Sequence, residues 1–175
     1  FLYVLAAPAF LGTHLALAPT QIFWFFVLTI SGIMAGAWLS GRLAGRIAPQ
    51  RQIRMGFVVM LAVSVLNLLA NLLLVPHVSW ALIPIAVFAF GWALMVPVVT
   101  LLVLDLHPER RGMASSLQAC IGSAANGLVA GVIVPLVMHS TRLLAATSLA
   151  MMAVGLVAWV LLRRRWPDTG QHITA

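Results

Sequence analysis

Long apolar runs separated by short polar links are the dominant pattern of this sequence. About 20 apolar residues are needed to cross the hydrocarbon core of a bilayer, and six runs approach or exceed that length. They cover residues 1–17, 22–40, 55–75, 80–104, 112–138 and 143–162. Unbroken runs of this length predict helices, because an open strand would leave backbone groups unpaired in lipid. We therefore expect an all-α membrane protein with six transmembrane helices and a short tail, residues 163–175.

The arginines predict how these helices are oriented. The chain has ten arginines and no lysine, and nine of them lie after the second run, after the fourth run or in the tail, whereas the short links hold only Arg142. Basic residues collect on the cytoplasmic side of membrane proteins, so both chain ends are expected there. With 63% hydrophobic and 7% charged residues the chain is not a soluble domain, and the expected partner of its arginines is an anionic leaflet rather than nucleic acid.

The chain opens at Phe1, inside an apolar run. We therefore expect it to be a fragment of a longer protein. Small residues recur at every fourth position in two of the runs, at Gly32, Gly36 and Ser40, and at Ser115, Ala119, Ser123, Gly127 and Gly131. Such residues allow close helix approach in lipid, either within this unit or against a missing partner domain.

The runs match in pairs by the kinds of residue that they contain. The first and fourth hold prolines and aromatic residues, the second and fifth hold the small residues, and the third and sixth are plain and apolar, apart from Asn67 and Asn71, which are expected to bond to a neighbouring helix. This order predicts a 3+3 internal repeat, an architecture found in transporters.

The link after the second run carries a motif. It reads Gly41-Arg42-Leu43-Ala44-Gly45-Arg46-Ile47-Ala48-Pro49-Gln50-Arg51. This resembles the cytoplasmic loop motif of the major facilitator superfamily, with Gly45 in place of the family's aspartate. The resemblance implies a gating loop at Gly41, Arg42 and Arg46, in which Gly41 allows two helices to approach closely; ordinary positive-inside arginines are the alternative.

A second stretch, Asp105 to Gln118, resembles the bicyclomycin and chloramphenicol resistance branch of that superfamily, as do the residues from Tyr3 to Phe10. The resemblance implies the C-terminal half of a twelve-span exporter in a bacterial inner membrane. Its partners would be the missing six-span half, a small amphipathic substrate and protons, and no cofactor or metal is expected. Asp105, Arg110 and Arg111 are candidates for a gate ion pair, or for a solvated charge cluster.

Aromatic residues of the first and fourth runs are the candidates for substrate binding, since amphipathic compounds are held by apolar burial and stacking. The candidates are Tyr3, Phe10, His14, Phe88, Trp92 and Met95. Aromatic residues at helical spacing also serve as plain packing residues, which is the alternative for each one.

No catalytic motif of an enzyme is present. The three acidic residues, Asp105, Glu109 and Asp168, all lie in links or the tail, so a proton-carrying carboxylate at mid-membrane would belong to the missing half. Export by alternating access is the expected function. A carrier of sugars or other metabolites is the first alternative, and a non-transport membrane subunit is the second.

Overall fold

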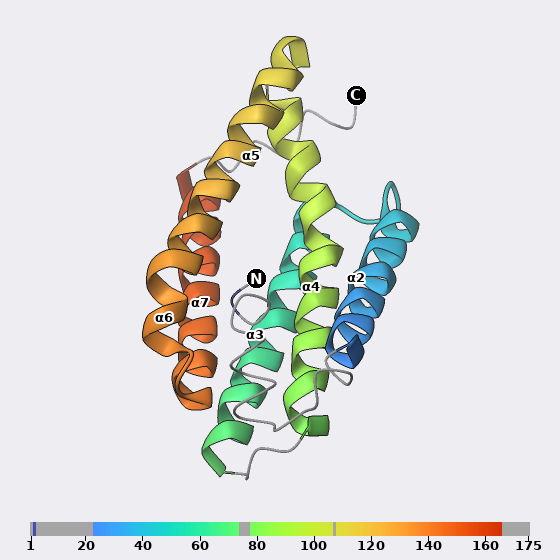
Figure 1. Ribbon diagram of the computed structural model, residues 1–175. Coiled ribbons are helices and arrows are strands. Elements are labelled where there is room, and N and C mark those ends of the chain that lie inside the picture. The colour runs from blue at the N-terminus through green and yellow to red at the C-terminus, as the bar shows by residue number, and fades with distance from the viewer. Residues whose placement is uncertain (1, 3–22, 74–77, 107, 166–175) are drawn as a thin grey trace.

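A computed structural model describes residues 2, 23–73, 78–106 and 108–165 of the chain. In order, the elements are α2 (Phe23–Leu43), α3 (Pro49–Leu73), α4 (Val78–Asp105), the 3-10 turn η3 (Pro108–Arg110), α5 (Arg111–Leu128), the π-helical turn η4 (Val129–Ile133), α6 (Val134–Val137) and α7 (Thr141–Arg165). No strand occurs in these ranges (Figure 1). The all-helical expectation is confirmed.

Five segments among the described residues are long and apolar enough to cross a membrane, as in a multi-pass membrane protein. They are Phe23–Leu43, Pro49–Leu73, Leu82–Asp105, Pro108–Val137 and Thr141–Leu162. The expected first span, residues 1–17, lies almost entirely outside the described residues. The sixth span and the 3+3 repeat therefore stay predictions.

The third helix starts earlier than the apolar pattern indicates. We expected it near Met55, but α3 begins at Pro49, so Arg51 and Arg54 lie in its first turns. Proline suits the first position of a helix because its missing N–H needs no partner there. Arginine is a good helix former whose stem can follow apolar surface while its charge stays in water. The apolar run marks the part of the helix that crosses lipid. The helix itself begins several residues before that run.

The fifth span is not one regular helix. Its hydrogen-bond pattern shifts at η4, where the N–H of Val134 donates to the carbonyl of Val129, five residues back. Pro135 follows at once; it has no N–H to donate and its ring crowds the carbonyl four residues earlier. The π-turn and the proline together separate α5 from α6 within one span.

The long helices alternate in direction (Figure 1). The C-terminal ends of α2, α4 and α7 and the N-terminal ends of α3 and α5 lie at the upper end of the view, which we call the arginine end. Helix α4 packs against both α2 and α3, and α7 also packs against α3. The core has two parts: one joins α2, α4, α6 and α7 around Phe25 and Leu144, and the other joins α3 and α7 around Phe57 and Met152.

The contact between α2 and α4 is a contact between backbones. A Cβ atom at Gly32 would collide with the carbonyl oxygen of Ala86, and one at Gly36 with that of Phe90. On the other side of α4, a Cβ atom at Gly56 of α3 would lie 2.9 Å from the carbonyl oxygen of Gly91. The small residues of the second run therefore pack within this chain, against α4.

A buried glutamine joins the same three helices. Gln52 of α3 is 2% exposed, and its Nε2 donates to Ser40 Oγ of α2 at 2.7 Å and to the Leu94 carbonyl of α4 at 2.9 Å. Both amide protons are thereby satisfied away from water. Sequence analysis did not single out Gln52, because a glutamine beside two arginines reads as part of a polar link.

Asn67 and Asn71 were expected to bond to a neighbouring helix. The Asn71 amide instead donates within α3, to the carbonyl of Asn67 at 2.8 Å and to its Oδ1 at 3.1 Å. Residues four apart on a helix are neighbours on its surface, so Asn71 is satisfied without leaving its own helix.

Replacing Gly36 with alanine should loosen the bundle. The added methyl group meets backbone, which cannot rotate away, so we expect a loss of about 1–3 kcal/mol in the free energy of unfolding. Thermal unfolding in detergent, followed by size-exclusion chromatography, measures the change. Gly122→Ala is the control: nothing lies within 4 Å of a Cβ atom there, and alanine favours a helix. Equal destabilisation by both variants would contradict the close contact.

Replacing Gln52 with leucine should destabilise the protein by about 1 kcal/mol, because two interhelical hydrogen bonds are lost and Ser40 Oγ loses its partner. Unfolding by denaturant in mixed micelles is the measurement. Gln50→Leu is the matched control, since Gln50 makes no side-chain hydrogen bond among the described residues. A stability loss no greater than that of the control would show that the Gln52 bonds do not hold the helices together.

Candidate functional site

The link between α4 and α5 carries an ion pair at the arginine end. Arg111, the first residue of α5, donates from a guanidinium nitrogen to Asp105 Oδ1 of α4 at 2.9 Å. The side chains are 59% and 44% exposed, and Glu109 and Arg110 beside them are exposed as well. A pair this exposed contributes at most about 1 kcal/mol to stability. It can therefore break and re-form at little cost when helices move.

The expected gating residues Gly41 and Arg42 lie at the end of α2, and Arg46 lies in the loop between α2 and α3. Among the described residues, nothing lies within 4 Å of a Cβ atom built on Gly41, so a close helix approach at this glycine stays a prediction. The described close approaches of α2 occur further down the helix, at Gly32 and Gly36. The Arg42 guanidinium lies 4.4 Å from the Trp38 ring centroid, one helical turn away, and Arg46 is exposed.

Gly45 stands where the resembled motif has aspartate. Its backbone conformation explains why glycine occupies this position. Its φ is +74°, a left-handed conformation that glycine adopts without steric cost. The N–H of Arg46 and the N–H of Ile47 then both donate to the carbonyl of Leu43, at 3.0 and 3.2 Å. Gly45 therefore ends α2 and turns the chain toward α3.

The candidate substrate residues are only partly brought together. Phe88 and Met95 are half-buried and pack against the cluster that α3 and α7 form around Phe57, while Trp92 remains 47% exposed. Tyr3, Phe10 and His14 lie outside the described residues. Of the three described candidates, Phe88 and Met95 are in packing contacts, and Trp92 is the one with an open face.

The small residues of α5 have an open face as well. No residue of α5 is buried, and nothing lies within 4 Å of a Cβ atom at Gly127 or, in η4, at Gly131. Ser115, Ala119 and Ser123 are likewise exposed. One side chain ties α5 to α4 near mid-helix: Gln118 Nε2 donates to Thr100 Oγ1 at 3.1 Å. The two small-residue stripes thus differ, since that of α2 is occupied by α4 and that of α5 is open.

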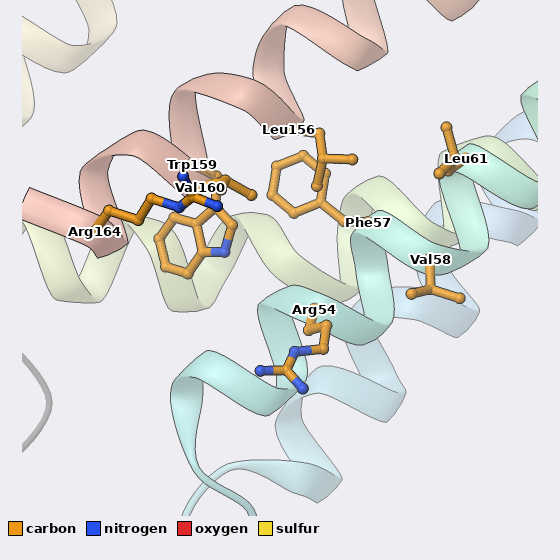
Figure 2. A pocket seen from close by; sticks show the side chains of 8 residues that line it. All are labelled: Arg54, Phe57, Val58, Leu61, Leu156, Trp159, Val160 and Arg164. Atoms are coloured by element: carbon orange, nitrogen blue, oxygen red, sulfur yellow. The ribbon is translucent and has the colours of Figure 1, made fainter. Parts of the chain in front are cut away.

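A groove that sequence analysis missed lies between α3 and α7. Its volume is about 360 Å³, and it is lined by Arg54, Phe57, Val58, Leu61, Leu156, Trp159, Val160 and Arg164 (Figure 2). The Phe57 and Trp159 rings stack across it, with centroids 6.5 Å apart and planes 26° from parallel. The arginines come from the ends of two plain apolar runs, and only the packing of α3 on α7 places them in one groove.

In the described part of the chain, no group of three or more histidine, cysteine or acidic side chains is placed to hold a metal ion. Compared with known proteins, the chain matches no family model, no curated protein and no solved structure. The function of the protein is therefore inferred from the packing, the open faces and the charges described above.

Proposed function

We propose that this chain is the C-terminal half of a facilitator-type transporter, which exports small amphipathic compounds by alternating access. The chain would work with a second six-span half, and protons would drive export. Because α2, α3 and α4 are locked together, they are suited to move as one body, and the open small-residue face of α5 is suited to meet a partner.

The observation that carries the proposal is the open face of α5. Exposed small residues are of little use against lipid, because lipid tails gain nothing from them, whereas a second helix can approach them closely. The described part of the chain supplies no such helix. Another transmembrane domain would cover the stripe, with Trp92 of α4 as the one described substrate candidate that a neighbouring cavity could reach.

The Asp105–Arg111 pair supports a conformational role. It spans the link between α4 and α5 and is exposed, so relative movement of the two helices would alter it directly. No acidic residue lies within the apolar core of a described span. In a proton-coupled exporter the titrating carboxylate would therefore come from the other half of the protein.

Drug susceptibility of cells that express the full-length protein is the test of this proposal. Export predicts raised tolerance to several unrelated amphipathic compounds, lost when a protonophore removes the proton gradient. Unchanged susceptibility together with uptake of a labelled sugar or other metabolite would favour the alternative, a metabolite carrier. A full-length protein without a second six-span half would contradict the proposal.

Filling the open stripe should impair transport without unfolding the protein. In the full-length protein, Gly127→Leu is expected to lower the rate of drug efflux by about tenfold or more, because leucine keeps a partner helix from close approach. Gly122→Leu is the matched control; it lies on α5 about 140° around the helix and is equally open. Similar efflux by both variants would mean that the stripe contacts no partner.

Breaking the ion pair should affect transport more than stability. Asp105→Asn is expected to lower the efflux rate by about fivefold, equivalent to about 1 kcal/mol, while the melting temperature stays close to that of the parent. The charge swap Asp105→Arg with Arg111→Asp should restore part of the rate, and Glu109→Gln serves as the control. Loss of stability without loss of rate would assign the pair a structural role only.

A further inference from the structure

The groove between α3 and α7 combines two charges with an apolar trough. Arg54 and Arg164 come from different helices and lie at the same end of the groove as Trp159, while Leu61 lies toward the other end (Figure 2). Both arginines are exposed, and neither makes an ion pair within the described residues. Two guanidinium groups with no carboxylate partner in the described part of the chain favour an anion, and the planar donors of arginine suit phosphate oxygens.

The remainder of the groove favours a hydrocarbon chain. Phe57, Leu61, Leu156 and Val160 line it, and the stacked Phe57 and Trp159 rings form a rigid wall. The distance along α3 from Arg54 to Leu61 is about 10 Å at the helical rise per residue. This is long enough to hold the upper part of an acyl chain whose anionic head lies between the arginines.

The surroundings of the groove indicate where its ligand comes from. Val58, which lines the groove from α3, is 59% exposed, and Val160, which lines it from α7, is 40% exposed. Exposed apolar side chains on membrane-spanning helices face lipid wherever no other transmembrane helix covers them. Trp159 and the arginines lie near the ends of their spans, where aromatic and basic residues meet lipid headgroups. A ligand that enters from the side, with its head at the interface and its tail in the core, is a membrane lipid.

We propose that this groove binds an anionic phospholipid, with its phosphate between Arg54 and Arg164 and one acyl chain along Phe57 and Leu156. Basic pockets between transmembrane helices on the cytoplasmic side suit anionic headgroups in this way. The site is separate from the open face of α5, and its assignment to a lipid does not depend on which molecule the protein transports.

Lipid retention by the purified full-length protein tests the proposal. The protein is equilibrated with equal amounts of phosphatidylglycerol and phosphatidylcholine of the same chain length, and bound lipid is counted by native mass spectrometry. We expect preferential retention of phosphatidylglycerol, reduced at least about tenfold by Arg54→Gln with Arg164→Gln. The control, Arg46→Gln with Arg51→Gln, removes the same charge at the same end and should retain the lipid. Equal loss in both double variants, or no preference in the parent, would overturn the proposal.

A second measurement needs no variant and so does not depend on the folding of one. Phosphatidylglycerol with a photoactivatable acyl chain is crosslinked to the parent protein in nanodiscs, and the labelled peptides are sequenced. Labelling concentrated at residues 57–61 of α3 and 156–160 of α7, and weaker with the phosphatidylcholine analogue, supports the site. Labelling spread evenly over all spans would overturn it, as would crosslinks between two copies of the chain through these residues, which would mean that a second protein molecule covers the groove.

Discussion

The close backbone contact between α2 and α4 is the constraint on which the rest of the described structure depends. Helices in lipid gain little from burying apolar side chains, because lipid tails are equally apolar, and they associate through close packing and hydrogen bonds instead. Gly32 and Gly36 allow close packing against the backbone of α4. Gln52 supplies hydrogen bonds to both α2 and α4. Helix α4 is thereby held from both sides, and its position determines where Trp92 is exposed and where Asp105 meets Arg111.

The close packing of α2, α3 and α4 contrasts with the exposed faces of α5. Helix α5 meets α4 through the Gln118–Thr100 hydrogen bond and the exposed Asp105–Arg111 pair, and its small residues have no partner in the described chain. In the transport proposal, the well-packed three-helix unit keeps its shape while the exposed Asp105–Arg111 pair to α5 breaks and re-forms. The irregular hydrogen bonds at η4, next to Pro135, add a second place in this span where the regular helix is interrupted.

The two proposals use different faces of the molecule. The proposal of transport relies on the open face of α5 and on Trp92 of α4, whereas the proposal of lipid binding relies on α3 and α7. Phe57 connects them physically: its ring lines the groove and belongs to the cluster against which Phe88 and Met95 of α4 pack. A lipid in the groove would therefore contact the layer that supports α4.

The sequence by itself determined that the chain is helical and built from membrane-spanning segments, because run length and the absence of internal charge leave no other way to satisfy the backbone in lipid. It also determined which residues are small enough for close helix contact. It did not determine which of those contacts form: Gly36 meets α4 and Gly127 meets nothing described, although both lie in stripes of the same kind. Nor did it indicate that Gln52 is buried, that α3 begins at Pro49, or that Arg54 and Arg164 share a groove. These features depend on which helices pack together. Helices of similar apolar composition do not reveal, from their own sequences, which helix will be their neighbour. Only the tertiary packing decides that, through the few positions where a glycine, an amide or an arginine fits one neighbour and no other.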